Sequence, residues 1–280
     1  IAREAINKYG VDPIIAVKAA CHHASRYFLL NNRGAIAPGY LADFAVIDNF
    51  KDFNVEMVFK KGVLYWNNGE LRDFEAPKIE EYLDKRAHDT FHLPVLSPAD
   101  FANTRLRGVI GMVPGQIITE DAGYAAGVDV SKDILKMAVV ERHKNTRHIG
   151  IGYLKGYGLK SGAVATSVAH DSHNIICVGT NDEDMAFAVN RIARNRGGIV
   201  VVENGQVLAE LPLEIAGIIS GKPLREVNTL LEDAKKAAHA LGVGTDIDPF
   251  MTLSFMSLPV IPTLRLTTRG VVDVNTQQYV

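Results

Sequence analysis

The segment IVVVENGQVLAEL, residues 199–211, decides the fold class of the second half of the chain. It begins with four consecutive β-branched residues, which favour a strand because their side chains pack well on a pleated surface. Asn204 and Gly205 follow, and this dipeptide is typical of a two-residue type I′ hairpin turn. Residues 206–211 return as a second strand, so the sequence predicts an antiparallel hairpin here.

Further strands and helices are expected on both sides of this hairpin. One amphipathic helix begins at an Asn181 cap and ends at Gly197, and a second begins at Pro223 and ends at Gly242. Runs rich in β-branched residues predict strands at residues 104–110, 116–119, 134–140, 148–153 and 175–178. This mixture of strands and helices predicts an α+β or mixed α/β domain.

The first part of the chain has a different organisation. Gly10 ends an opening helix, and Asp12 followed by Pro13 caps the next helix, because proline is tolerated at the first helical position. Residues 44–47 predict a strand, and residues 56–66 predict a hairpin. These are small pieces of sheet rather than a complete domain.

The two ends of this first part also carry information. Between residues 67 and 98, prolines and charged residues replace the apolar pattern, so we place a domain boundary there. The chain begins with Ile1 rather than Met, inside a helical pattern. We therefore expect the chain to be truncated at its N-terminus.

The composition limits the partners of this protein. Among 280 residues, 30 Lys and Arg stand against 32 Asp and Glu, a net charge of -2, which gives no broad attraction for a nucleic acid polymer or an anionic membrane. No apolar run approaches the roughly 20 residues that cross a bilayer. The two cysteines, Cys21 and Cys177, are too few for a disulfide framework, which favours a reducing, cytoplasmic location.

The densest group of polar side chains is HDSHN at residues 170–174. Its candidate site residues are His170, Asp171, His173 and Asn174. The group lies just before a predicted strand, and the ends of strands are where sites often form. Its imidazoles and carboxylate suit hydrogen bonding to a heterocycle, proton transfer or a metal site. A turn that satisfies its own backbone donors is the alternative.

Other polar groups give weaker signals. Glu141 and His143 end a predicted strand and are minor candidates, although solvated charge at a strand end also explains them. The adjacent His22 and His23 look like metal ligands, but neighbouring residues of a helix diverge by roughly 100°, so packing is the better interpretation. Residues 246–262, which mix Met, Phe and Pro, either line an apolar pocket or interface or belong to the core.

Several segments together resemble a known enzyme family. Residues 16–20, followed by GAIAPGYLAD at 34–43, are similar to the part of metal-dependent amidohydrolases in which a helix leads into the Gly-x-Ile-x-x-Gly-x-x-Ala-Asp motif of a small β-sandwich. Residues 156–175, 179–191 and 248–262 look like the C-terminal domain of the bacterial adenine deaminase family. The resemblance covers essentially the whole chain.

The resemblance implies a division of the chain into four parts. We expect the last helices of an amidohydrolase (β/α)8 barrel, part of the small β-sandwich, a linker, and an α+β C-terminal domain. The corresponding residues are 1–33, 34–75, 76–98 and 99–280.

The resemblance also implies a chemistry, the hydrolysis of adenine to hypoxanthine and ammonia by a metal-activated water. The divalent metal is expected to be Mn or Fe, with Zn as the alternative, and its ligands in the family would precede Ile1, so no metal ligand is assigned in this chain. We expect the chain alone to be inactive and residues 170–174 to shape the purine pocket. The family further implies a homo-oligomer, expected as a dimer.

Two other interpretations stay open from the residues alone. The sandwich motif is widespread among amidohydrolases, so an amidohydrolase that acts on another cyclic amide is one alternative. A protein that kept this C-terminal domain without the barrel would instead be a non-catalytic binding or assembly module.

Overall fold

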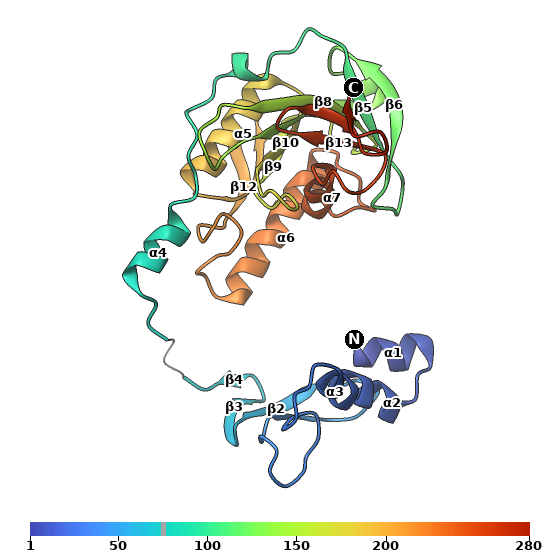
Figure 1. The fold of residues 1–280 in the computed structure, drawn as a ribbon, viewed down its shortest axis with the longest axis vertical. Coiled ribbons are helices and arrows are strands. Elements are labelled where there is room, and N and C mark those ends of the chain that lie inside the picture. The colour runs from blue at the N-terminus through green and yellow to red at the C-terminus, as the bar shows by residue number, and fades with distance from the viewer. Residues whose placement is uncertain (74–76) are drawn as a thin grey trace. The chain divides into compact units, whose positions relative to one another are not determined.

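The chain folds into two compact units, Ile1–Lys78 and Ile79–Val280. The computed structural model describes residues 1–73 and 77–280, and Figure 1 shows that each unit has its own helices and strands. Residues 75 and 76, where we expected the sandwich to end and the linker to begin, lie outside the described residues. The fold class is mixed α/β, with several sheets and few helices.

Unit 1, residues 1–78, opens with short helices. The first helix ends where Gly10 adopts a left-handed φ of 64°. Asp12 caps the second helix by accepting hydrogen bonds from the backbone N–H groups of Ile14 and Ile15 at 2.9 and 3.1 Å. Both predicted helix boundaries are confirmed. The helical elements are α1 (Ala2–Tyr9), α2 (Pro13–Lys18), a π-helical turn (Ala19–His23) and α3 (Ala24–Tyr27).

A four-stranded antiparallel sheet completes unit 1. Its strands are β1 (Phe44–Ile47), β2 (Val55–Lys60), β3 (Val63–Asn67) and β4 (Glu70–Leu71), and they pair in chain order. The predicted hairpin is confirmed, with Lys61 and Gly62 both at positive φ in its turn. Phe44 and Phe59 stack across β1 and β2 with their ring centroids 4.6 Å apart. These two rings therefore lie on the same face of the short sheet.

An eight-stranded sheet forms the centre of unit 2, residues 79–280. The strands are β5 (Arg107–Met112), β6 (Thr119–Ala125), β7 (Ile134–Val140), β8 (Ile149–Lys155), β9 (Ala163–Thr166), β10 (Ile175–Gly179), β11 (Gly198–Glu203) and β12 (Gln206–Pro212). Their spatial order is β12-β11-β9-β10-β7-β8-β5-β6, and only β5 and β8 pair in parallel. The predicted hairpin turn is confirmed, because Asn204 and Gly205 have φ values of 51° and 70°.

Alternate residues of the central strands enter two separate cores. In β7, Met137 and Val139 face one core, whereas Ala138 and Val140 face the other. Three α-helices contribute to these cores, α5 (Asp182–Arg194), α6 (Leu224–Ala240) and α7 (Pro249–Met256). The first core takes apolar residues from α6 and α7, and the second takes them from α5, so helices cover both faces of the sheet (Figure 1).

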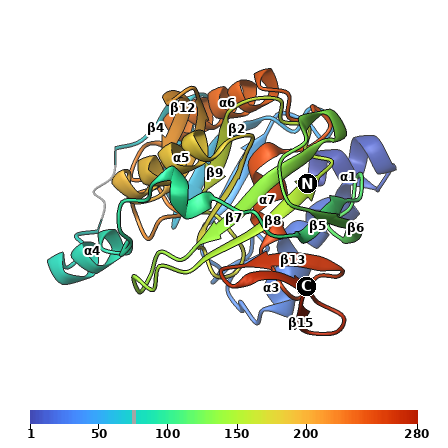
Figure 2. The same cartoon turned by 90° about the horizontal axis from the view of Figure 1, so that it is seen from above.

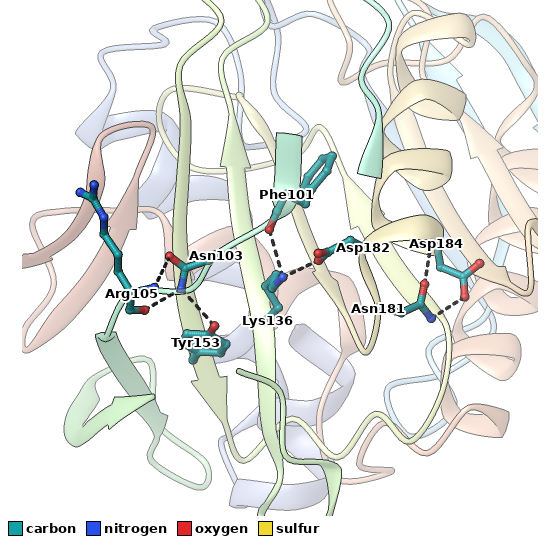
Figure 3. A network of polar contacts seen from close by, with 8 residues as sticks. All are labelled: Phe101, Asn103, Arg105, Lys136, Tyr153, Asn181, Asp182 and Asp184. Atoms are coloured by element: carbon teal, nitrogen blue, oxygen red, sulfur yellow. Dashed lines mark hydrogen bonds and ion pairs between the residues drawn. The ribbon is translucent and has the colours of Figure 1, made fainter. Parts of the chain in front are cut away.

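A buried lysine closes one edge of the second core. Lys136 is 7% exposed, donates a hydrogen bond from Nζ to the carbonyl of Phe101 at 3.0 Å, and forms an ion pair with Asp182 at the start of α5. Nearby, Nδ2 of Asn103 donates to the hydroxyl of Tyr153 at 3.2 Å. Figure 3 shows how these contacts fasten the segment before β5 onto the sheet.

A second, three-stranded sheet packs against unit 2's main sheet. Its strands are β13 (Leu264–Thr267), β14 (Gly270–Asp273) and β15 (Gln278–Tyr279), seen in Figure 2 beside β5 and β6. Oγ1 of Thr119 donates to the carbonyl of Leu264 at 2.8 Å and accepts from the N–H groups of Thr263 and Leu264 at 3.0 Å. A Cβ at Gly150 would lie 1.8 Å from the Thr267 carbonyl oxygen, so β8 needs glycine there.

Some elements differ from those expected. The strand predicted at residues 116–119 starts only at Thr119, because the N–H of Gln116 donates to the carbonyl of Val113 at 3.1 Å and makes a turn instead. Helix α4 (Glu81–His88) lies in the segment expected to be a linker, and none of its residues is buried. Across residues 1–73 and 77–280, every helix is too short or too polar to cross a membrane.

Candidate functional site

The pairing of β7 with β10 places the candidate polar groups side by side. Residues 170–174 form the loop between β9 and β10, and Val140 at the end of β7 pairs with Ile175 at the start of β10. The residues that follow β7 therefore run beside this loop. Nε2 of His143 lies 2.8 Å from the carbonyl oxygen of Ser172, so His143 contacts the loop directly.

His170 is held by α7. Its backbone N–H donates to the carbonyl of Ser254 at 2.9 Å, and its carbonyl accepts from Oγ of Ser257 at 3.4 Å. Its ring lies 5.0 Å, centroid to centroid, from the ring of Phe255. The segment 246–262 thus supports the candidate loop as well as the core.

His173 combines an unusual backbone conformation with a partly buried ring. Its φ is 48°, and its N–H donates to the carbonyl of Ala169 at 2.6 Å. Nδ1 is buried and has no hydrogen-bond partner among the described residues. Burial of the ring lowers the pKa of His173 below its ordinary value, and the positive charges of His170 and Arg142 lower it further. The imidazole is therefore neutral around pH 7 and able to accept or donate one hydrogen bond.

Two candidate residues line one cavity. Asp171 and Asn174 line a space of about 370 Å³, which falls in the range of about 300–1,000 Å³ common for small-molecule pockets. Leu258, Pro259 and Val260 add apolar walls to it. His170 and His173 instead contact each other, with ring centroids 5.8 Å apart. The loop therefore splits into cavity-lining residues and residues that pack within the loop.

Glu141 stabilises the turn in which it lies. Its carboxylate accepts hydrogen bonds from the N–H groups of His143, Lys144 and Thr146 at 2.5, 2.9 and 3.0 Å, and from the hydroxyl of Thr146. Partial burial opposes ionisation, but these hydrogen bonds outweigh it and lower the pKa of Glu141 below its usual range. Glu141 thus shapes the turn that presents His143 to the candidate loop.

The pattern-based reasoning missed Arg142. This side chain is only 2% exposed and contacts the loop through His173 and Asn174. The alternation of β7 contained a signal. Position 142 continues the series Lys136, Ala138 and Val140, which lies on the face of the sheet that meets the second core. A charged residue at a position that the strand pattern predicts to be buried indicates a candidate site more strongly than a run of charges at the end of a strand.

The earlier metal candidates do not assemble into a site. No group of three or more His, Cys, Asp or Glu side chains in residues 1–73 and 77–280 is arranged to hold a metal ion. The rings of His22 and His23 lie 5.8 Å apart at a tilted angle, within the π-helical turn.

Residues 246–262 contribute to both a cavity and the core. Phe250 and Leu253 are buried in the first core, whereas Met251 and Phe255 line a second cavity of about 270 Å³ with residues 112–118.

Comparison with known proteins shows the family to which this chain belongs. Residues 2–65 match the model of the amidohydrolase family, and residues 116–278 match the model of the adenine deaminase C-terminal domain. The chain belongs to the adenine deaminase family, as its sequence motifs predicted.

Individual relatives agree with this family. The chain is 43% identical over 288 residues to an adenine deaminase of Dehalococcoides mccartyi, covering 98% of this chain and 49% of the relative. It is also 43% identical over 288 residues to an adenine deaminase of Nitratidesulfovibrio vulgaris, covering 97% of this chain and 48% of the relative. An adenine deaminase 2 of Carboxydothermus hydrogenoformans is 43% identical over 278 residues, 95% of this chain and 48% of that protein. The chain spans about half the length of the curated relatives it matches.

Proposed function

We propose that this chain is part of an enzyme that hydrolyses adenine to hypoxanthine and ammonia. The observation that carries the proposal is the 43% identity over 98% of the chain to a protein named adenine deaminase. Because the chain matches 49% of that relative, the remaining half would supply the other part of the active site. The chain alone would then be inactive.

The metal would belong to that other part. A divalent ion, Mn or Fe with Zn as the alternative, supplies an activated water in this class of hydrolysis. The described side chains do not fit such an ion, since no three suitable ligands converge. The ligands would therefore lie in the half of the relatives' length that this chain does not match. The contribution of this chain is to bind and orient the purine.

The proposed architecture follows from the two family matches. Residues 1–33 would be the last helices of the (β/α)8 barrel, residues 34–75 part of the β-sandwich, residues 76–98 a linker and residues 99–280 the C-terminal domain. The amidohydrolase match over residues 2–65 supports the first two assignments. We further propose a cytoplasmic enzyme that acts as a homodimer in purine metabolism.

The candidate loop would shape the purine pocket. Asp171 and Asn174 line the cavity, and a carboxylate and the NH2 group of an amide match the amino group and the ring nitrogens of a purine. Leu258 and Pro259 offer apolar surface to the flat ring. His170 and His173 would hold the loop in place from within.

A chimera tests this role. The chain is joined to the half of the Dehalococcoides mccartyi relative that it does not match, and ammonia release from adenine is measured for Asn174→Ala, His170→Ala and His173→Ala. We expect kcat/KM to fall by about tenfold or more, the equivalent of one hydrogen bond to the reacting complex. His148→Ala, which alters an exposed imidazole outside the loop, is the control. Unchanged turnover in all three loop variants would contradict the proposed role.

A further inference from the structure

Arg142 is a buried cation without an acidic partner. It is 2% exposed, and none of the ion pairs among the described residues involves it. Burial lowers the pKa of Arg142 to about 10, so the guanidinium is still charged at neutral pH. A charge in such a place is costly unless its N–H groups are well satisfied. The contacts that satisfy it therefore indicate what it does.

Three backbone carbonyls accept the hydrogen bonds of this guanidinium. Nε donates to His173 at 2.5 Å, Nη1 to Thr90 at 2.8 Å, and Nη2 to Ala216 at 2.9 Å. The guanidinium also lies 4.2 Å from the ring centroid of Phe91. The three acceptors come from segments far apart in the sequence. One planar side chain thus joins the segment before the sheet, the loop after β12 and the candidate loop.

The backbone of Arg142 adds to the same junction. Its N–H donates to Oδ1 of Asn174 at 3.3 Å, and its carbonyl accepts from the N–H of His92 at 2.7 Å. The loop after β12 fits closely around the guanidinium, since a Cβ at Gly217 would lie 2.8 Å from Nη2. His173 and Asn174, the last two residues of the candidate loop, are therefore both fixed by one residue.

We propose that Arg142 is the positioning residue of the 170–174 loop, holding His173 by its carbonyl and Asn174 by its amide so that Asn174 stays at the cavity. This inference rests on the proposed role of the loop in adenine binding. Arginine is required because its rigid fork of donors reaches three carbonyls at once, whereas the single ammonium of lysine keeps the charge without the fork. Arg142→Lys therefore keeps the positive charge and removes the three-way hydrogen bonding, so it tests the hydrogen bonds separately from the charge.

Lys136 provides a matched control. It lies in β7, six residues before Arg142, is also buried and also donates to a backbone carbonyl, but its contacts are Phe101 and Asp182, outside the candidate loop (Figure 3). Lys136→Met removes a buried cation from β7 itself, and Lys136 makes no hydrogen bond to residues 170–174, which lie in the described part of the chain.

The first readout needs no activity. Amide hydrogen exchange at His173, whose N–H donates to Ala169, is measured in the 280-residue chain. We expect exchange to become about tenfold faster or more in Arg142→Lys and Arg142→Met, with less than about a twofold change in Lys136→Met. The imidazole signal of His173, assigned with a His173→Gln variant, is followed in parallel. The His173 ring faces His170, Asp171, His143 and Arg142. The midpoint of its pH titration should therefore rise when Arg142→Met removes a positive charge.

The second readout separates this inference from the proposed function. In the chimera, Arg142→Lys should raise KM for adenine by about tenfold, and Lys136→Met should leave it within about twofold. Unchanged His173 exchange in Arg142→Lys overturns the positioning role whatever the activity. Faster exchange with no adenine turnover in the parent chimera supports the positioning role and refutes the proposed function instead.

Discussion

Asp184 offers a direct test of how unit 2 is held together. The side chain is 2% exposed, and both of its carboxylate oxygens accept hydrogen bonds. Oδ2 accepts from Nδ2 of Asn181 at 2.9 Å and from the N–H of Asn204 at 3.2 Å, and Oδ1 accepts from the N–H of Gly205 at 2.8 Å. Asp184 therefore ties the start of α5 to the hairpin turn between β11 and β12, and Figure 3 shows its contact with Asn181.

Replacing Asp184 by Asn should lower the free energy of unfolding by about 2.5–6 kcal/mol. An amide NH2 in place of either oxygen faces an N–H donor, so at least one hydrogen bond to a charged group is lost, which costs about 1.5–3 kcal/mol. A buried donor is also left without an acceptor, which costs about 1–3 kcal/mol more. The control is Glu183→Gln, which removes the same charge from the same helical turn at an exposed position and should cost about 0.3–1 kcal/mol.

Urea unfolding followed by far-ultraviolet circular dichroism measures both variants by linear extrapolation. Trp66 is the single tryptophan of the chain and lies in unit 1, so its fluorescence gives an internal reference. A cost for Asp184→Asn no greater than that of Glu183→Gln would refute the reasoning about this buried carboxylate.

Three further predictions concern titration, thiol reactivity and packing. Because the pKa of His173 is lowered by folding, the unfolded chain binds this proton first as pH falls below about 6.5, so stability is lost there. The urea midpoint should therefore drop less between pH 7 and pH 5 in His173→Gln than in the parent, and equal drops would argue against it. Cys21 is exposed, whereas Cys177 is buried and burial raises the pKa of its thiol. Iodoacetamide should therefore modify one thiol in the native chain and two in denaturant. Two adducts on the native chain, detected by mass spectrometry, would contradict this prediction. Gly150→Ala should destabilise unit 2 by about 1–3 kcal/mol or more, because the added Cβ meets a backbone oxygen at the end of β13. The control is Gly127→Ala, which has open space around the added Cβ and should cost less than about 0.5 kcal/mol in the same urea assay.

Local signals made much of the secondary structure predictable. The Asp12 cap, the Asn204-Gly205 turn and the helix that follows Asn181 each depend on residues close together in the sequence, and all three are present. Strands such as β7 and β10 were visible because helices bury both faces of the sheet, which gives a continuous apolar run.

Other elements lacked such a signal. Strand β9 (Ala163–Thr166) is only four residues long, and its two alanines, which pack beneath α5, have little strand preference. Helix α4 buries none of its residues, so no apolar period reveals it. Strands β13 to β15 depend on contacts such as the hydrogen bonds between Thr119 and Leu264, which are 145 residues apart.

The candidate site, too, was predictable from the sequence only in part. The group His170 to Asn174 is contiguous, so the sequence alone is enough to select it as a candidate. The meeting of His143 and Arg142 with this group requires the register in which Val140 pairs with Ile175, and no local pattern fixes that pairing. The burial of Arg142 likewise depends on two distant loops that supply its acceptors.

Ammonia release from adenine tests the central proposal most directly. The 280-residue chain and the chimera with the unmatched half of the Dehalococcoides mccartyi relative are assayed side by side, each with and without added Mn²⁺ or Fe²⁺. We expect metal-dependent ammonia release from the chimera and none from the chain alone. Metal-dependent release from the chain alone would show that its own residues form a complete catalytic centre, and would contradict the proposal that this chain supplies only the purine-shaping part.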